Sequence, residues 1–535
     1  MGNRKLLDCT LRDGGYVNDW KFGHDQIVEI FKRLISAGID VVEIGFLDDR
    51  RAYDDNRTIM PDTQAINKIF GGLDKGNSIV VAMIDYGTCR LEHIQHCSDT
   101  FIDGIRVIFK EPLMYEALDF CKQLKQLGYI VYAQMVSVTT YTDEKLKEYA
   151  ELVNSVEPYA TSMVDTYGLM HPFQLLHIFE ILNTYLNPQI AIGFHGHNNL
   201  QMAYANAIAY LNSHTSRILI VDGTLYGMGK SAGNAPSELL AAYMNHHYGI
   251  TYDIIRMLET IDTFILEIYQ KQYWGYTISF FIAACYQCHP NYINFLIDKK
   301  TLSVKQIIDM LQSIIPSKKL MYDAAYAEKL YVDYQSIQCD DTAVMTWLKQ
   351  VVAEKNIVIL GPGNNLNKQK YRVKKYIKKN KPLIMAVNFV PADIKVDYIF
   401  LTNAKRYSQL ADDMGNSVNN GHDIGIIATS NVTKTKGSFP YVLNFSTLID
   451  TNTEIIDNSL VMLIKAMIKV QVKCVNLAGF DGYSRKNDNY FNASREYTFV
   501  KEKAGYLNGY ISDFLASVKE KITVNFITSS RYKES

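Results

Sequence analysis

The sequence predicts an α/β protein in which a (β/α)8 barrel with capping helices is followed by a smaller, open α/β domain. Two observations support this prediction. Between residues 5 and 223, eight apolar segments of strand length alternate with amphipathic segments that have helical periodicity. After a mainly helical stretch, a second series of strand-like segments begins with NIVILGPGNN at Asn356.

The eight apolar segments follow one another at intervals of roughly 30 residues, the length of a strand, a helix and their connections. Right-handed crossovers between eight parallel strands close a sheet into a barrel. The segments are KLLDCT from Lys5, VVEIGF from Val41, IVVAMI from Ile79, GIRVIF from Gly104, IVYAQM from Ile130, ATSMVD from Ala160, IAIGFH from Ile190 and ILIVDG from Ile218.

Helices are expected between these strands because several intervening segments, such as DQIVEIFKRLISAG, are amphipathic and end at a glycine. At 535 residues the chain is also longer than one hydrophobic core usually serves. We therefore expect a barrel over residues 1–295, a helical connector over 296–353 and an open α/β domain over 354–535.

Composition and charge argue against nucleic acid and membranes as partners. The chain has 55 Lys and Arg residues against 56 Asp and Glu residues, so its net charge is −1. The most apolar stretch, TISFFIAACYQC from Thr277, is too short to cross a bilayer. The 8 cysteines are scattered and the N-terminus does not resemble a signal peptide, which favours a cytoplasmic protein with reduced thiols.

Polar residues stand where the predicted barrel strands end. Active sites of (β/α)8 barrels lie at the carboxyl ends of the strands, so we expect these side chains to face one mouth. The alternative is that they simply begin solvated loops, as in any α/β protein. The residues are Arg12, Asp13, Glu43, Asp85, Gln134, Asp165, His195, His197 and Asp222.

The two histidines of GFHGHNN, His195 and His197, predict a metal site. Side chains two residues apart on a strand point the same way, so both imidazoles can bind one ion. Asp13, at the end of the first strand, can add a third ligand. A lone histidine is more often a packed or surface residue, but a pair with an acidic partner at a barrel mouth favours metal.

A glycine-rich loop, DGTLYGMGKSAGNAPSELL from Asp222, follows the eighth predicted strand and leads into a helix. Its backbone N–H groups could bind a phosphate, or the loop could be a flexible lid. Composition leaves both alternatives open.

Together, CTLRDGG, GFHGHNN and GTLYGMGKSAGNAP resemble, in order and spacing, the signature segments of a superfamily of metal-dependent aldolases and lyases on a (β/α)8 barrel. This group includes 4-hydroxy-2-oxovalerate aldolase, 3-hydroxy-3-methylglutaryl-CoA lyase and isopropylmalate synthase. The resemblance covers about residues 4–295.

The resemblance implies a ligand set and a substrate class. Asp13, His195 and His197 would hold a divalent cation, Mn²⁺ or Mg²⁺, with Asn234 as a fourth ligand. A 2-oxo acid such as pyruvate would chelate this cation, and Arg12 would face the oxygen that becomes negative as the enolate forms. The partners would be a small 2-oxo acid and an aldehyde, and the enzyme could be a homo-oligomer.

One position departs from the family pattern. Three residues after the metal aspartate, the aldolases carry a histidine that acts as a base, whereas this chain has Tyr16. A phenol is a poor base at neutral pH unless its pKa is lowered. A perturbed Tyr16, another residue such as His24, or metal-bound water would have to move the proton. By alignment, Tyr286 falls where the aldolases keep an active-site tyrosine, with His289 nearby, although helix packing explains both equally well.

In the C-terminal half, Gly361 and Gly363 of IVILGPGNN follow a predicted strand, as glycines of nucleotide sites often do. The segment lacks the full G-x-G-x-x-G spacing. The adjacent basic stretch KQKYRVKKYIKK is better interpreted as a solvated helix face. This half resembles Rossmann-like domains found beside enzymes of bacterial surface polysaccharides.

The sequence thus predicts a class II metal-dependent aldolase, a carbon–carbon lyase that forms or cleaves a 4-hydroxy-2-oxo acid, with a role in surface-polysaccharide biosynthesis and a nucleotide at the C-terminal domain. Two alternatives stay open. One is a Claisen-type synthase or lyase that acts on an acyl-CoA. The other is a nucleotide-binding transferase in the C-terminal domain, with the barrel as a scaffold.

Overall fold

A computed structural model describes residues 3–299, 302–319, 322–336, 339–407, 410, 424–432, 439–450, 455–492, 496 and 498–534. The chain forms two compact units, Met1–Pro290 and Asn291–Ser535. Within the described ranges, every helix is too short or too polar to span a lipid bilayer.

The first unit is a closed barrel of eight parallel strands, which confirms the predicted fold class. The sheet closes because β1 pairs with both β9 and β2. A two-residue strand, β3 (Ile59–Met60), lies beside β2. The barrel strands are β1 (Arg4–Asp8), β2 (Val41–Leu47), β4 (Ile79–Asp85), β5 (Gly104–Phe109), β6 (Ile130–Met135), β7 (Ala160–Asp165), β8 (Ala191–Gly196) and β9 (Leu219–Gly223).

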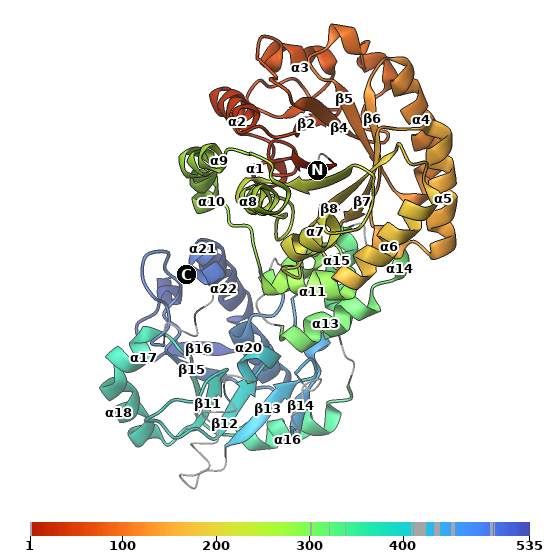
Figure 1. Cartoon of the computed structure of the whole chain (residues 1–535). Helices are drawn as coiled ribbons and strands as arrows, with labels where there is room; N and C mark the ends of the chain where they lie inside the picture. The colour runs from red at the N-terminus through yellow and green to blue at the C-terminus, as the bar shows by residue number, and fades with distance from the viewer. Residues whose placement is uncertain are drawn as a thin grey trace. The chain divides into compact units, whose positions relative to one another are not determined.

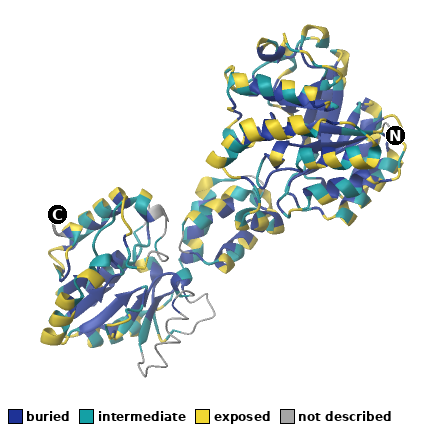
Figure 2. Ribbon diagram, turned by 60° about the vertical axis from the view of Figure 1, so that its left-hand side comes forward, coloured by how far each residue is buried: buried dark blue, intermediate teal, exposed yellow. Residues whose placement is uncertain are grey.

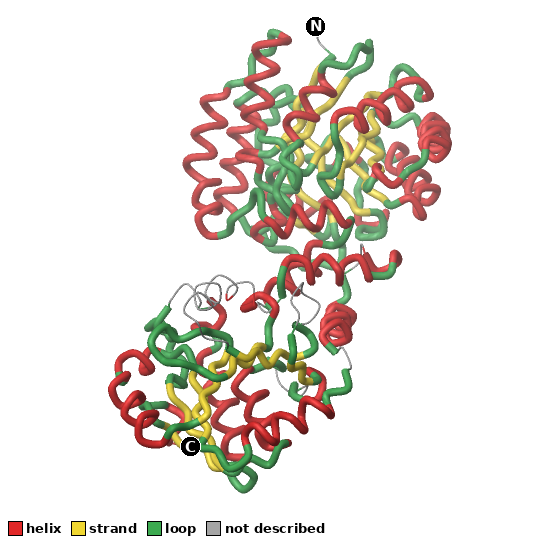
Figure 3. The backbone as a smooth tube through the Cα atoms, turned by 90° about the horizontal axis from the view of Figure 1, so that it is seen from below, coloured by secondary structure: helices red, strands yellow, loops and turns green. Residues whose placement is uncertain are grey.

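Helices encircle these strands (Figures 1 and 3). Side chains cap the N-termini of two of them: the Asp62 carboxylate accepts from the Ala65 N–H at 2.7 Å, and the Thr142 hydroxyl accepts from the Lys145 N–H at 3.3 Å. The helices are α2 (His24–Ser36), α3 (Thr63–Phe70), α4 (Met114–Gln126), α5 (Asp143–Val156), α6 (Pro172–Tyr185), α7 (Ala203–Leu211) and α8 (Ser237–Tyr248).

The inside of the barrel is layered, because alternate residues of each strand point inward. One layer is apolar and contains Leu7, Val41, Val81, Tyr132, Ala160, Ala191 and Ile220. The next layer contains charged residues. Arg106 of β5 is fully buried, with Nη1 3.0 Å from Glu43 Oε2 and Nη2 2.5 Å from Asp222 Oδ2. The barrel therefore carries an ion network directly beneath its mouth.

The chain from residue 254 to 352 is mainly helical. In the first unit it forms α9 (Ile254–Thr260), a π-helical turn (Ile261–Ile265), α10 (Leu266–Lys271) and α11 (Ile278–Tyr286). The remaining helices group with the second unit, where the Trp347 ring stacks on Tyr441 with centroids 3.5 Å apart. They are α12 (Pro290–Asp298), α13 (Val304–Ser313), α14 (Pro316–Lys319), α15 (Ala324–Gln335) and α16 (Thr342–Val352).

The second unit contains a seven-stranded parallel sheet in the order β14-β13-β12-β11-β10-β15-β16, which confirms the predicted open α/β architecture. Figure 2 shows its strands as mostly buried. The strands are β10 (Ile357–Leu360), β11 (Leu383–Val387), β12 (Tyr398–Leu401), β13 (Gly425–Thr429), β14 (Tyr441–Leu443), β15 (Cys474–Ala478) and β16 (Thr523–Phe526).

Both faces of this sheet are covered by apolar clusters. Ile357 and Ile359 belong to one cluster, and Val358 and Leu360 belong to the other, as strand alternation requires. The first cluster includes residues of α16, α20 and α22, and the second includes residues of α17 and α18. The helices of this sheet are α17 (Asn364–Lys368), α18 (Lys370–Asn380), α20 (Ser459–Lys469), α21 (Thr498–Glu502) and α22 (Ala504–Val518).

Gly361 and Gly363 follow β10, where the turn after β15 approaches closely. A Cβ on Gly361 would lie 2.7 Å from the Gly479 carbonyl oxygen, and one on Gly363 would lie 2.5 Å from the same atom. The two glycines are therefore required by the packing of two turns of the chain against each other.

Replacing Arg106 with methionine should destabilise the barrel, because Glu43 and Asp222 would keep buried negative charges without their cation. Breaking a buried ion pair in this way costs about 3–5 kcal/mol. Urea unfolding of the full chain, followed by hydrogen exchange of barrel peptides, measures this loss. Adding Glu43→Gln and Asp222→Asn to this variant should restore much of the free energy of unfolding. If Arg106→Met alone lowered the free energy of unfolding by less than about 1 kcal/mol, the ion network would not stabilise the barrel.

Gly361→Ala should destabilise the C-terminal sheet by about 1–3 kcal/mol, because the new methyl group overlaps the Gly479 carbonyl. Gly509→Ala is the matched control, since Gly509 lies within α22 and a Cβ there meets no atom within 4 Å. That control should gain about 1 kcal/mol from helix propensity. Hydrogen exchange of peptides containing β10 and β15 distinguishes the two variants, and equal protection in both would show that the close approach does not matter.

Candidate active site

Three predicted ligands converge at the barrel mouth. Asp13 follows β1, and His195 and His197 lie at the end of β8. Their potential ligand atoms all lie within 4.8 Å of one another, and His195 Nε2 is 3.5 Å from Asp13 Oδ2. All three side chains are buried. The barrel thus brings together residues that are more than 180 positions apart in the sequence.

Asn234 joins this cluster from the loop after β9. It forms an isolated bridge with His197, and its Nδ2 donates to Asp13 Oδ1 at 2.9 Å. Among the described residues, Asn234 Oδ1 and His197 Nδ1 are buried without a hydrogen-bond partner. Unsatisfied buried atoms of this kind are rare. An oxygen and a nitrogen with free lone pairs beside a carboxylate fit a divalent cation.

The protonation states of Asp13 and His197 also suit a cation. Burial lowers the pKa of His197 to about 3, so its imidazole is neutral at physiological pH. Burial alone would raise the pKa of Asp13, but Arg12 and then the two histidines hold it well below its usual value. The cluster therefore offers an ionised carboxylate and a neutral imidazole, the forms that bind metal ions.

A closed ring of charged and hydrogen-bonded groups connects this cluster to the network beneath it. Arg12 Nε donates to Glu43 Oε2 at 2.6 Å, and Arg12 also pairs with Asp13. On the other side, His195 Nδ1 lies 3.0 Å from Asp222 Oδ2. Since Arg106 contacts both Glu43 and Asp222, the ring is complete. Glu43 thereby orients Arg12, and Asp222 orients the His195 ring.

The other strand-end residues are arranged differently. Both Asp165 carboxylate oxygens accept backbone N–H groups, from Leu169 and Met170 at 2.9 Å each, so this residue shapes the loop after β7. Burial raises its pKa to about 6. Gln134 is buried, whereas Asp85 is exposed at the end of β4.

Tyr16 lies in the short helix α1 (Gly15–Asn18), with 40% of its surface exposed. Its ring packs edge-on to Trp20, with centroids 4.7 Å apart, and the Trp20 indole N–H donates to the Arg12 carbonyl at 2.7 Å. A Cβ on Gly15 would overlap the Trp20 ring, which explains this glycine. Burial and then the charge of Asp13 raise the pKa of Tyr16 above its usual value. The phenol therefore stays neutral and is suited to donate a hydrogen bond.

Sequence reasoning missed two charged residues of this site. Arg106 lies within an apolar strand, where only its inward register could have indicated a role. Lys230 lies in the glycine-rich loop, with Nζ 5.4 Å from the centre of the Tyr16 ring. Burial lowers the pKa of Lys230, and the negative charges of Asp13 and Asp85 partly oppose this decrease. The position of this lysine within a glycine-rich loop was the sequence feature that could have indicated its place in the site.

The glycine-rich loop folds back onto the barrel. The Thr224 N–H donates to the Ala235 carbonyl at 3.1 Å, and the Asn234 N–H donates to the Gly227 carbonyl at 3.0 Å. In addition, the Lys230 N–H donates to Asp13 Oδ1 at 3.1 Å. These bonds position Asn234 and Lys230 at the mouth.

Tyr286 is the last residue of α11 and is half-buried. It follows Cys285, and its carbonyl accepts the Cys288 thiol at 3.2 Å. Burial and then the charge of Lys230 lower the pKa of the neighbouring His289. A catalytic role for Tyr286 stays a prediction, as does one for His24, which begins α2.

Several known proteins are similar to the N-terminal half of this chain. Residues 3–263 match the HMGL-like family. A 4-hydroxy-2-oxovalerate aldolase from Pelotomaculum thermopropionicum is 28% identical over 258 residues, which cover 48% of this chain and 74% of the relative. One from Stutzerimonas stutzeri is 28% identical over 247 residues, covering 45% and 68%. The structure of an HMG-CoA lyase from Bacillus subtilis aligns with 51% of this chain and 94% of its own, with 19% identity and a TM-score of 0.39.

The family match spans the eight barrel strands and the loop that carries Asn234. Its relatives are aldolases, and the second sheet lies outside the matched residues. Residues 3–263 of this chain are therefore similar to the HMGL-like family, and their (β/α)8 barrel carries the cluster of Asp13, His195 and His197.

Proposed function

We propose that the protein is a class II, divalent-metal-dependent aldolase that forms or cleaves a 4-hydroxy-2-oxo acid. The observation that supports this most directly is the convergence of Asp13, His195 and His197 beside Arg12 in a buried site at the barrel mouth. The similarity to 4-hydroxy-2-oxovalerate aldolases supports the same reaction class. Mn²⁺ and Mg²⁺ are the ions that we propose.

Breaking or making a carbon–carbon bond beside a carbonyl group places negative charge on the carbonyl oxygen. A divalent cation at the cluster would supply Lewis acidity towards that oxygen. Arg12 adds a fixed positive charge, and its described contacts use Nε and Nη1, which leaves the donors of Nη2 for the substrate. Because Glu43 and Asp13 hold the guanidinium, this donor is oriented before the substrate binds.

Tyr16 and Lys230 would act on the acceptor side of the reaction. The neutral phenol of Tyr16 would donate a hydrogen bond to the aldehyde oxygen, or to the hydroxyl group in the cleavage direction. Lys230, above the Tyr16 ring, would attract the anionic substrate into the mouth. Tyr286 would complete this side from α11.

A Claisen-type reaction with an acyl-CoA is the second candidate, because Asn234 lies within the cluster. Release of free CoA thiol from acetyl-CoA and 2-oxo acids would identify this reaction. A role in surface-polysaccharide biosynthesis stays a prediction.

His195→Ala and Asp13→Ala should each lower the release of pyruvate from 4-hydroxy-2-oxo acids by at least about 10³-fold, because each removes a ligand of the cation. Both variants should also lose equimolar binding of Mn²⁺, measured by elemental analysis after dialysis. Chelators should abolish turnover of the unchanged protein.

His177→Ala is the control for these variants, since His177 is an exposed residue of α6 that pairs with Asp143. It should keep both metal binding and turnover. Full activity in His195→Ala and Asp13→Ala together would reject the proposed function.

Arg12→Lys should lower kcat by about 10²–10³-fold with a smaller change in KM, because it removes an oriented donor to charge that develops in the transition state. Lysine keeps the positive charge but cannot reproduce the planar pairing with Glu43 and Asp13. Arg90→Lys, at an exposed ion pair with Asp49, should leave both parameters unchanged. If kcat of Arg12→Lys stayed within threefold of the parent value, Arg12 would not stabilise the transition state.

A further inference from the structure

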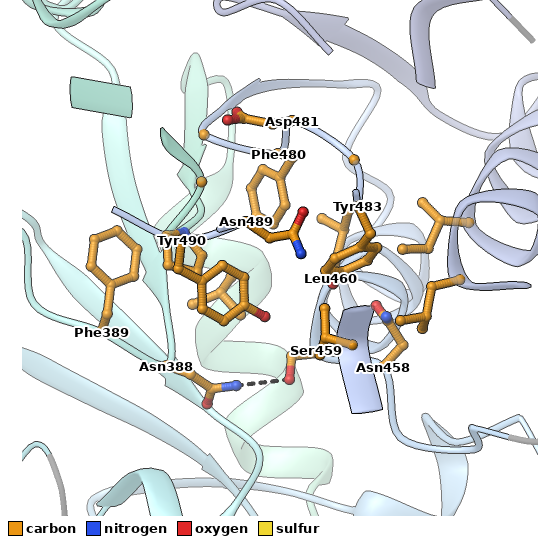
Figure 4. A pocket seen from close by; sticks show the side chains of 18 of the residues that line it. Asn388, Phe389, Asn458, Ser459, Leu460, Phe480, Asp481, Tyr483, Asn489 and Tyr490 are labelled. Carbon is orange, nitrogen blue, oxygen red and sulfur yellow. Dashed lines mark hydrogen bonds between the residues drawn. The ribbon is translucent and has the colours of Figure 1, made fainter. Parts of the chain in front are cut away.

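The second unit contains a cavity of about 150 Å³ at the carboxyl ends of its central strands (Figure 4). Segments that follow β10, β11, β12 and β15 line it, together with the N-terminal end of α20. Gly363 belongs to this lining, whereas Gly361 does not. None of the residues that we place at the barrel mouth takes part in it.

The cavity coincides with the point where the strand order of the sheet reverses. From β10 the chain continues to β11 on one side, whereas β15 pairs with the other side of β10. The connections after β10 and β15 therefore leave in opposite directions and open a crevice between them. Ligands of open α/β sheets bind in such crevices.

Asp481 makes the start of α17 unsuitable for a pyrophosphate group. Its Oδ2 accepts the Asn365 N–H at 2.7 Å, so a carboxylate of the protein occupies the position next to the glycine turn. A Cβ on Gly363 would lie 2.8 Å from Asp481 Oδ1, which shows how closely this carboxylate packs on the turn. A second anion at that position would be repelled. Dinucleotides that place a pyrophosphate at the glycine turn are thus disfavoured.

Five aromatic residues dominate the walls of the cavity: Phe389, Phe480, Tyr483, Tyr490 and Tyr532. Burial, and then the neighbouring phenols of Tyr490 and Tyr532, raise the pKa of Tyr483 well above its usual value. The Tyr483 phenol therefore stays neutral at physiological pH. Flat aromatic faces with neutral hydroxyl groups suit a planar ring that carries polar atoms.

Two of the amide side chains around the cavity are already used within the protein. Asn388 donates to the Ser459 hydroxyl at 2.7 Å, as Figure 4 shows, and accepts the Thr402 N–H at 3.1 Å. Asn489 accepts the Ser484 N–H at 2.6 Å and donates to Glu496 at 2.6 Å. A sugar ring needs many hydrogen-bond partners when it is buried, and these amides do not supply them.

Charge and volume restrict the ligand further. The charged residues of the lining are Arg406, Asp457 and Asp481, a set that does not favour a polyanion. A cavity of about this volume holds one benzene-sized ring in another protein. The enclosed part of the ligand is therefore a single planar ring system.

We propose that this cavity binds the base of a nucleoside or nucleoside monophosphate, stacked among the aromatic side chains, and that it rejects dinucleotides. The site belongs to the second unit alone and does not depend on the chemistry proposed for the barrel. Under this proposal the predicted nucleotide binds in the cavity. Gly361 and Gly363 serve the packing of the two turns rather than the binding of the nucleotide.

Calorimetric titration of the full chain with the four ribonucleosides, their 5′-monophosphates, NAD⁺ and FAD tests this proposal. At least one nucleoside or monophosphate should bind with Kd below about 1 mM, and the dinucleotides should bind at least 10-fold more weakly. Comparing each nucleoside with its monophosphate shows whether the phosphate contributes. Hydrogen exchange should show protection of residues 387–389 and 479–483 by the ligand.

Phe480→Leu should weaken this binding by about 10-fold or more, because it removes one stacking surface while keeping an apolar side chain. Tyr371→Leu is the matched control, since Tyr371 is 81% exposed on α18 outside the cavity. It should bind as tightly as the parent protein. If Phe480→Leu does not fold, the ligand panel and hydrogen exchange on the parent protein decide the question. Binding of no nucleoside or monophosphate, tighter binding of dinucleotides or monosaccharides, or protection in the barrel instead would overturn the proposal.

Discussion

The closed ring of Arg12, Glu43, Arg106, Asp222, His195 and Asp13 is the interaction on which the barrel site depends. Charges buried inside a barrel are tolerated only when each has a partner. In this ring every carboxylate contacts at least one cation or imidazole. The same contacts that pair the buried charges also orient Arg12 and His195, so the stability of the barrel interior and the geometry of its mouth have one physical cause.

The two units differ in the polar groups that they carry at the carboxyl ends of their strands. Both are parallel sheets, and in both the carboxyl ends of the strands carry polar residues. At the barrel mouth, His197 Nδ1 and Asn234 Oδ1 have no hydrogen-bond partner among the described residues. In the C-terminal crevice, Asp481 already occupies the start of α17, so an anion is not needed there. The first site is therefore suited to a metal ion and the second to a neutral ring.

Tyr16 shows how a family pattern can be modified without loss of the site's framework. The raised pKa of the Tyr16 phenol suits it to donate a proton in a hydrogen bond rather than accept one. Lys230, which lies over the same ring, supplies positive charge that the aromatic ring alone could not. Together they give this side of the barrel mouth a hydrogen-bond donor and a positive charge that the cluster of Asp13, His195 and His197 does not supply.

Several features followed from the sequence by itself. The eight strands and the second sheet could be predicted because apolar runs and helical periodicity are local properties. The shared direction of His195 and His197 followed from strand alternation. Only the tertiary structure showed that Arg106 joins Glu43 to Asp222, that Lys230 reaches Tyr16, and that Asp481 occupies the glycine turn. These contacts connect residues far apart in the sequence, and their partners are fixed by barrel closure and strand register, which no local pattern encodes.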